Sequence, residues 1–314
     1  MPAAILLQGL SKTYVSGPPW KRKRVEALKP TDLEVPWGGV FGLLGLNGAG
    51  KTTTVKLILG LLKASSGRAE ILGGDIADRA IRCQIGYLPE LPYFSRQLTA
   101  FETLRYFGSL YGFTGAGLDR KVEETLELVR LTRAAHQRVA EYSKGMQQRL
   151  GIGQALIGGP KLFLCDEPMS GLDPVGNKEM REIFLDMKRS GTTIFMNTHI
   201  LDEAERICDH IAVLHEGRLI AQAPIAEVLE ARARVPYVLE LPQDALRVLK
   251  DHPVQGIRLE GVCLTLAGAD LSSVLAELSK LGVQPTSVRP LSSAMEAYFL
   301  RTIGYAAAGK EAVA

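Results

Sequence analysis

Residues 45–52 read Gly-Leu-Asn-Gly-Ala-Gly-Lys-Thr, and the rest of the chain is organised around this stretch. The pattern is a complete GxxxxGK[ST] phosphate-binding loop, which is informative only between a strand and a helix. The apolar run 40–44 before it is typical of a buried parallel strand, and the apolar spacing of 53–62 after it is typical of a helix. The stretch therefore predicts an α/β fold that binds nucleotide phosphates at the end of a strand.

Each residue type in this loop has a physical role in holding phosphate. Glycine has no Cβ, so the loop backbone can curl and point its N–H groups at phosphate oxygens. Lys51 can reach the β- and γ-phosphates, and the Thr52 hydroxyl can hold Mg²⁺. The alternative interpretation is an ordinary glycine-rich turn. The residues predicted to contact ATP here are Gly45, Leu46, Asn47, Gly48, Ala49, Gly50, Lys51, Thr52 and Thr53.

The composition is that of a globular protein with room for one large and one small domain. The chain has 314 residues, 46% of them hydrophobic and 23% charged, and a formal net charge of +3. Because Lys and Arg nearly balance Asp and Glu, the charge gives no reason to expect a nucleic-acid partner. The basic run Lys21–Arg24 beside Trp20 is interpreted as a solvated loop or, alternatively, as a contact with anionic lipid headgroups.

Cysteine usage and hydropathy predict a cytoplasmic protein. Cys83, Cys165, Cys208 and Cys263 are widely spaced without a CxxC pair, which favours core residues in a reducing compartment over disulfides or a metal site. No run of 18 or more apolar residues is present, so we expect no membrane span. The N-terminus lacks the positive region and apolar core of a signal peptide, and we expect it to form a strand.

Changes in hydrophobic period predict two domains and a tail. Strand-like runs recur through 1–232, interrupted at about 91–158 by helical spacing. We therefore predict a P-loop NTPase domain with a mixed-sheet α/β core and a helical insertion. Residues 233–302 have the order strand, helix, strand, strand, helix, strand, which predicts a small α+β ferredoxin-like accessory domain. Residues 303–314 are expected to form a flexible tail.

A pair of carboxylates in the second half of the chain narrows the chemistry. The apolar run Leu162–Cys165 predicts another buried strand, and Asp166 and Glu167 follow at its carboxyl end, where open parallel sheets place ligands. Asp166 is predicted to hold Mg²⁺, and Glu167 is predicted to orient or deprotonate the attacking water. The alternative is that these carboxylates only cap the next turn.

Several segments occur in the order known from one family. They are Tyr14, Gly45–Thr52, Asp166–Pro168, Ser170–Pro174 and Thr198–His199. Over residues 4–230 the chain resembles a nucleotide-binding subunit of an ATP-binding-cassette transporter. The resemblance implies that Tyr14, just after the strand expected at 5–10, stacks on adenine rather than packing against its own loop. It also implies that Asp173 lies in a loop crossing between two cassettes and that His199 touches the γ-phosphate.

Two motifs depart from the family pattern. Tyr142–Met146 reads Tyr-Ser-Lys-Gly-Met where the family usually has Leu-Ser-Gly-Gly-Gln. The resemblance implies that Ser143 and Gly145 contact ATP held by the partner cassette, while Lys144 adds a positive charge. Glu90 stands where the family usually has a glutamine that meets Mg²⁺, and a carboxylate can still meet the metal.

The resemblance implies a Mg²⁺-dependent ATPase in which Glu167 and His199 act at an interface between two cassettes, as a homodimer or heterodimer. It further implies an exporter-type membrane complex with the protein peripheral on the cytoplasmic face. The transmembrane permease subunit is expected to dock near Glu90–Phe94, where Tyr93 and Phe94 are both expected to be exposed. The alternative is that Phe94 packs back on the helix expected to start near Thr99. The alternatives are a soluble cassette ATPase of the translation or DNA-repair type and a degraded cassette that binds ATP only structurally.

Overall fold

The computed structural model describes residues 3–18, 20–230, 237–242, 245, 249, 257–260, 263–266, 271–290 and 293–304. The chain separates into two compact units, Met1–Ile225 and Ala226–Ala314. The domain boundary predicted after 232 lies outside the described residues, as do positions 305–314 of the expected tail.

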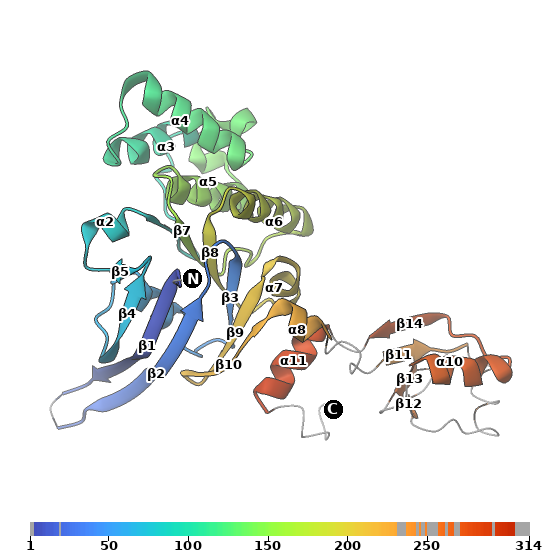
Figure 1. The fold of residues 1–314 in the computed structure, drawn as a ribbon. Coiled ribbons are helices and arrows are strands. Elements are labelled where there is room, and N and C mark those ends of the chain that lie inside the picture. The colour runs from blue at the N-terminus through green and yellow to red at the C-terminus, as the bar shows by residue number, and fades with distance from the viewer. Residues whose placement is uncertain are drawn as a thin grey trace. The chain divides into compact units, whose positions relative to one another are not determined.

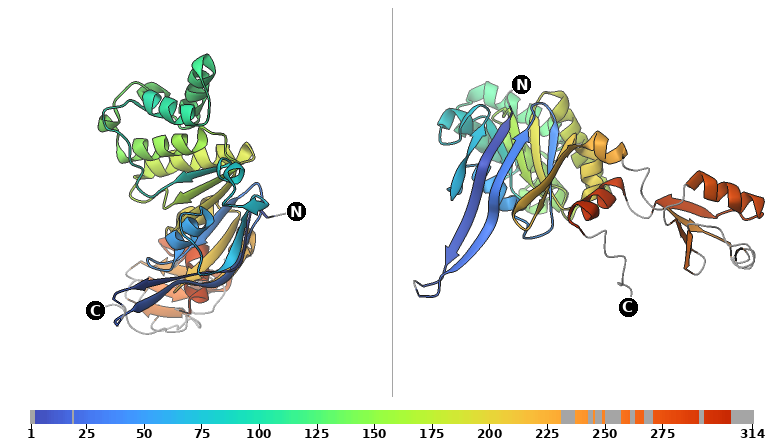
Figure 2. Two further views of the ribbon diagram at one scale, coloured as in Figure 1. Left: turned by 90° about the vertical axis from the view of Figure 1, so that its left-hand side faces the viewer. Right: turned by 60° about the horizontal axis from the view of Figure 1, so that its bottom comes forward.

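The first unit contains a small antiparallel sheet and a larger mixed sheet (Figures 1 and 2). The small sheet has the order β2-β1-β4-β5. Its first strand is longer than the sequence predicts, because pairing with β2 continues past Tyr14 to Ser16 and Lys23. The strands span Ile5–Ser16 (β1), Lys23–Val35 (β2), Ser66–Ile71 (β4) and Gly74–Asp75 (β5).

The larger sheet has the order β10-β9-β3-β8-β7-β6 and is parallel except for β10 at one edge. Its three central strands are mostly apolar and buried along their whole length, which is typical of a parallel sheet covered on both faces. The strands span Val40–Leu44 (β3), Ile85–Leu88 (β6), Leu162–Asp166 (β7), Thr193–Thr198 (β8), His210–His215 (β9) and Arg218–Pro224 (β10).

The main core joins apolar residues of both sheets and of α1 (Lys51–Ile58). Phe41 of β3 and Phe195 of β8 stack with ring centroids 5.7 Å apart. Val55 and Ile58 of α1 are fully buried in the same core. Since burying one large aliphatic side chain contributes about 1.5–3 kcal/mol, this packing fixes α1, and the loop before it, against the sheet.

Helices occupy the chain between β6 and β7, as the spacing of the insertion predicts (Figure 1). Thr99 begins the first of them with a capping box, in which it exchanges hydrogen bonds with Glu102. None of the helices in the described part of the chain is long and apolar enough to cross a bilayer. The helical segments of this unit are α2 (Arg79–Arg82), α3 (Ala100–Leu110), α4 (Gly115–Leu128), η1 (Thr132–Ala134), η2 (Val139–Glu141), α5 (Lys144–Leu156), α6 (Pro174–Arg189) and α7 (Leu201–Ile207).

The second unit contains a four-stranded antiparallel sheet with the order β12-β13-β11-β14. Leu239 of this sheet packs in a small core with Val274 and Leu278. The first helix expected in the accessory domain, between the strands β11 and β12, lies largely outside the described residues. The elements at this end of the chain are α8 (Ile225–Glu230), β11 (Tyr237–Glu240), β12 (Ile257–Glu260), β13 (Cys263–Leu266), α10 (Leu271–Lys280), β14 (Ser287–Pro290) and α11 (Ala294–Thr302).

Candidate functional site at the carboxyl ends of β3, β7 and β8

The carboxyl ends of three neighbouring parallel strands meet at one edge of the larger sheet. Leu44 at the end of β3 pairs with Thr198 at the end of β8, and Asp166 at the end of β7 pairs with Asn197. The residues that follow these strands therefore come together, although they lie far apart in the sequence. Open parallel sheets bind their ligands at this edge.

The loop after β3 runs close to neighbouring backbone, which explains two of its glycines. A Cβ at Gly45 would lie 2.5 Å from the carbonyl oxygen of Leu214, and one at Gly50 would collide with the carbonyl oxygen of Ala27. Gly50 also has a φ of 109° as the N-cap of α1. The loop therefore curls around the amino end of α1, where the helix dipole favours anions.

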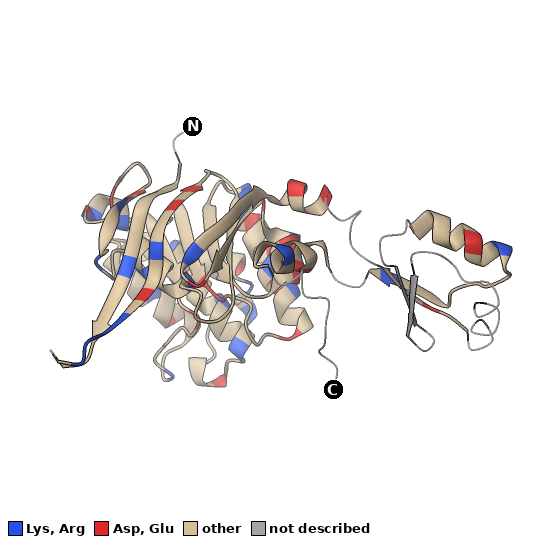
Figure 3. Ribbon diagram, turned by 90° about the horizontal axis from the view of Figure 1, so that it is seen from below, with Lys and Arg blue, Asp and Glu red and all other residues tan. Residues whose placement is uncertain are grey.

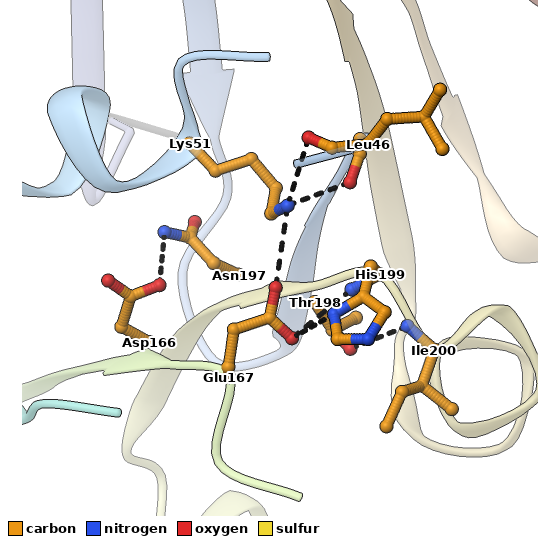
Figure 4. Close-up of polar contacts among 9 residues, drawn as sticks. Leu46, Lys51, Asp166, Glu167, Asn197, Thr198, His199 and Ile200 are labelled. Atoms are coloured by element: carbon orange, nitrogen blue, oxygen red, sulfur yellow. Dashed lines mark hydrogen bonds and ion pairs between the residues drawn. The ribbon is translucent and has the colours of Figure 1, made fainter. Parts of the chain in front are cut away.

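The side chain of Lys51 turns back beneath the loop and is only 6% exposed (Figure 4). Its Nζ donates hydrogen bonds to the carbonyl oxygens of Gly45 at 2.7 Å and Leu46 at 3.4 Å. The same nitrogen lies 3.4 Å from Oε1 of Glu167. The ammonium is therefore held between the loop and the acidic end of β7.

Glu167 connects this lysine to the end of β8. Its Oε2 lies 2.7 Å from Nδ1 of His199 and accepts the backbone N–H of His199 at 3.3 Å. Its own backbone has a φ of 49°, and its N–H donates to the carbonyl oxygen of Asn197 at 3.0 Å. A non-glycine residue in such a conformation costs about 1–3 kcal/mol, and strain of this kind clusters at functional sites. Lys51 and His199 thus hold the carboxylate of this 8% exposed residue in one orientation, and Asn197 holds its strained backbone.

Asp166 lies beside this cluster and is 4% exposed. The side-chain amide of Asn197 donates to its Oδ1 at 3.1 Å, while Oδ1 of Asn197 has no hydrogen-bond partner among the described residues. Burial and the neighbouring Asp166 charge raise the pKa of Tyr87 to about 12, so this phenol keeps its proton near neutral pH. Asn197 is not among the residues predicted from the sequence, where its only signal is its place just before Thr198-His199.

A cavity of about 390 Å³ opens over this strand edge. It brings together most of the predicted phosphate-loop residues with Glu90, Glu167 and His199, and adds Ala27 and Ser170, which were not predicted. Ser170 lies within the segment expected to cross between cassettes. Ala27 has no functional group, so nothing in the sequence indicates that it lines the cavity. The lining residues are Ala27, Leu46, Asn47, Gly48, Gly50, Lys51, Thr52, Thr53, Glu90, Glu167, Ser170 and His199.

Four residues predicted from the resemblance do not line the cavity. Tyr14 is 39% exposed on β1 and pairs with Val25, two residues before the cavity-lining Ala27. Ser143 and Asp173 are the exposed N-caps of α5 and α6, accepting the N–H groups of Met146 at 3.2 Å and Gly176 at 2.6 Å.

Gly145 follows Ser143 at the start of α5. A Cβ built on it would lie 3.8 Å from the Leu172 side chain, so the amino ends of α5 and α6 are adjacent. The exposed Ser143 and Asp173, with the half-buried Gly145 between α5 and α6, therefore form a second polar region on the same unit.

The loop expected to dock a membrane subunit has one exposed aromatic side chain instead of two. Tyr93 is 99% exposed, but Phe94 is 8% exposed and belongs to the core. The prediction that both are exposed is therefore wrong for Phe94, because neighbouring residues of an irregular loop can point in opposite directions. Glu90 is exposed, and its carbonyl oxygen accepts a hydrogen bond from Gln148 of α5 at 3.3 Å.

Comparison with known proteins connects this site to one family. A family profile described as ABC transporter matches residues 28–170. An uncharacterised ABC transporter ATP-binding protein of Synechocystis is 40% identical over 94% of this chain and 83% of its own length. The bacitracin transport ATP-binding protein of Bacillus licheniformis is 33% identical over 97% and 98% of the two chains. A Nod factor export ATP-binding protein of Cupriavidus metallidurans is 38% identical over 70% and 73%.

Solved structures agree with these relatives. An ATP-binding subunit of an ABC transporter superposes with a TM-score of 0.63 and 30% identity, over 88% of this chain and 99% of that one. A dimeric ATP-binding cassette in a post-hydrolysis state, bound to ADP and phosphate, superposes with a TM-score of 0.63 and 25% identity, over 70% and 98%. The predicted P-loop NTPase fold is thereby confirmed. The chain belongs to the ATP-binding proteins of ABC transporters, and it is an ATPase whose hydrolysis of ATP powers transport.

Proposed function

We propose that the chain hydrolyses ATP in the cavity at the ends of β3, β7 and β8, with Glu167 as the group that orients or deprotonates the attacking water. The observation that carries this proposal is the chain of contacts from the buried Lys51 through the buried Glu167 to the exposed His199. A carboxylate fixed by a cation on one side and an imidazole on the other is positioned for general-base work.

Lys51 has two roles in this proposal. Its ammonium exchanges the carbonyl oxygens of Gly45 and Leu46 for phosphate oxygens, which are stronger acceptors because they are charged. The same movement releases Oε1 of Glu167, the atom that faces Lys51 at 3.4 Å, and makes it available to a water molecule. His199 remains bonded to Oε2 and reaches toward the γ-phosphate.

The residues around the cavity fit Mg²⁺ when nucleotide supplies part of its ligand set. Among the described residues, no group of three or more His, Cys, Asp or Glu side chains can hold a metal ion alone. Mg²⁺ is commonly bound by one or two protein oxygens together with substrate phosphates. Thr52, Asp166 and Glu90 are the proposed ligands, and the buried Oδ1 of Asn197 is free to accept from a metal-bound water. The ion would neutralise phosphate charge.

We further propose that two cassettes act together, as a homodimer or a heterodimer. Ser143 and Asp173 are exposed, Gly145 is half-buried, and none of the three lines the cavity of its own chain, so they are available to a nucleotide held by a second chain. The dimeric cassette bound to ADP and phosphate supports this arrangement.

The transport complex is proposed to be of the exporter type, with the protein peripheral on the cytoplasmic face of the membrane. The support is the likeness to relatives named for bacitracin transport and for Nod factor export. A transmembrane permease subunit is proposed to contact the fully exposed Tyr93. The second candidate, a soluble cassette ATPase, would need no such surface.

The Glu167→Gln variant tests the catalytic proposal. Because glutamine keeps the shape and loses the basic oxygen, we expect ATP affinity to stay near that of wild type while kcat falls about 10²–10⁴-fold. Steady-state phosphate release and nucleotide titration measure the two quantities. The exposed Glu70→Gln on β4 is a matched control and should hydrolyse ATP normally. Near-normal turnover by Glu167→Gln would remove the base assignment.

A further inference from the structure

The β1–β2 pair extends beyond the sheet to which it belongs (Figures 1 and 2). β1 pairs with β4 only as far as Ser11, which lies opposite Ser66. Its pairing with β2 continues to Ser16, which lies opposite Lys23. Residues 12–16 and 23–26 thus form a projecting two-stranded ribbon, and 17–22 connect its ends. We refer to residues 12–26 as the projecting hairpin.

The end of the projecting hairpin concentrates positive charge (Figure 3). Lys21, Arg22, Lys23 and Arg24 follow one another and are all exposed. Within the described part of the chain, none of these four side chains forms an ion pair or a hydrogen bond. The nearest acidic residue along the chain is Glu26. Four neighbouring unpaired cations repel one another, and a surface of opposite charge relieves that repulsion.

An aromatic side chain accompanies these charges. Trp20 is 85% exposed and directly precedes the four basic residues, and Val15 and Val25 are 55% and 46% exposed on the ribbon. Scattered apolar residues on a surface need no explanation, but tryptophan next to clustered Lys and Arg matches the chemistry of a bilayer interface. There the indole lies at headgroup level while the cations meet lipid phosphates.

We propose that the projecting hairpin is a second membrane contact of this protein, which binds the surface of an anionic lipid bilayer through Lys21–Arg24 and Trp20. The contact is independent of Glu167 and of the Tyr93 loop, so it survives if either of those assignments fails. An anionic bilayer is favoured over a protein partner because the charge is contiguous on a thin ribbon, and because Trp20 and Lys21–Arg24 line none of the described cavities; one cavity reaches only Glu26 at the base of the hairpin.

The test is binding of the full-length protein to lipid vesicles, measured by co-sedimentation. Vesicles containing phosphatidylglycerol are compared with vesicles of phosphatidylcholine alone, at low and high salt. We expect binding only to the anionic vesicles and a strong loss at high salt, because exposed charges are screened. Each Lys or Arg near an anionic surface raises binding about fivefold, so changing all four to glutamine should weaken it roughly 10²–10³-fold.

A matched variant distinguishes the effect of the four hairpin cations from the effect of the protein's overall positive charge. Changing Lys56, Arg79, Arg133 and Lys161 to glutamine removes four exposed bases elsewhere and should leave vesicle binding within about threefold, because the effect falls off within a Debye length. Trp20→Ala should weaken vesicle binding several-fold and leave its salt dependence intact. ATP hydrolysis by each variant reports that the protein is folded.

Three outcomes would overturn the proposal. Equal binding to neutral and anionic vesicles would show that charge does not direct the contact. Equal losses in the hairpin variant and the matched variant would show that the hairpin has no special role. Binding of a labelled single-stranded oligonucleotide through Lys21–Arg24, without binding to phosphatidylglycerol vesicles, would assign the hairpin to nucleic acid.

Discussion

The strand edge around Lys51 and the helix ends at Ser143 and Asp173 present polar groups in opposite ways. At the strand edge, Lys51 and Glu167 are almost buried and bonded to each other and to their neighbours. At the helix ends, the polar groups are exposed, and their contacts within the chain are local caps. The first region therefore has its polar groups already paired within the chain, whereas the second leaves Ser143 and Asp173 open to solvent, as the proposed contact with a second cassette requires.

Ion pairs connect α5 and α6 behind the second region. Arg149 of α5 lies 3.5 Å from Glu179 of α6, and its guanidinium also donates to the carbonyl oxygen of Arg130 at 3.0 Å. Arg130 in turn pairs with Glu182 of α6. A half-exposed pair such as Arg130–Glu182 contributes only about 0.2–1 kcal/mol, whereas Arg149 is 13% exposed and connects α5 to α6 from a more enclosed position. At the strand edge, Lys51 and Glu167 are both almost buried, so that region is the more rigidly held of the two.

The largest effect is expected from dividing one site between two chains. Lys51→Ala disables the phosphate loop of the chain that carries it. Gly145→Ala adds a methyl group that its own chain can accommodate, so it should disturb only the nucleotide held by the other chain. Each variant alone should lose most turnover. A heterodimer of the two, purified with a different tag on each chain, should regain about half of wild-type turnover, because one of its two sites keeps both residues.

A chain that carries both substitutions supplies the control for this experiment. Paired with Lys51→Ala, it leaves no site with an intact Lys51, so its heterodimer should stay inactive. If the heterodimer of Lys51→Ala and Gly145→Ala were as inactive as the single variants, Lys51 and Gly145 would have to act on the nucleotide of the same chain. The contrast between the two regions would then have no functional meaning.

The next effect concerns Tyr93, the most exposed aromatic residue beside the helical insertion. If it anchors the permease, Tyr93→Glu should weaken co-purification with the membrane subunit by about 30-fold or more, the scale of an interface hot spot. Nucleotide affinity of the isolated protein should not change. Phe94 is left intact, because a carboxylate at this buried position would unfold the loop.

Leu61→Glu is the matched control for Tyr93→Glu. It places the same charge at another exposed apolar position, 63% exposed at the end of α1, and should leave the complex assembled. Normal assembly of Tyr93→Glu would move the docking surface elsewhere on the protein.

The phosphate loop and the buried strands were predictable because they follow from local rules. The glycine spacing before Lys51 predicts a phosphate-binding loop, and the continuous apolar runs at β3 and β7 predict buried strands. The helical insertion was predictable for the same reason, since its period changes sharply after β6.

Other features depend on contacts between distant segments and were not predictable. The strained φ of Glu167 is maintained by Asn197 and His199, thirty residues further along the chain. The burial of Phe94 and the length of the β1–β2 ribbon depend on packing and pairing that no local pattern specifies.

The smallest effect is expected at Tyr14, and it tests whether the nucleotide site at the strand edge around Lys51 extends to β1. The ring does not line the cavity, although its strand partner Val25 is two residues from Ala27, which does; the Lys12 ammonium lies 5.4 Å from the ring centroid. If the ring stacks on adenine, Tyr14→Ala should raise KM about tenfold with little change in kcat, because stacking stabilises bound substrate and transition state equally. Tyr14→Phe keeps the ring and should behave like wild type. Val15→Ala, at the next exposed position of the same strand, should change neither constant. An unchanged KM in Tyr14→Ala would mean that Tyr14 only packs within the β1–β2 ribbon, and that the nucleotide site extends no further than Ala27.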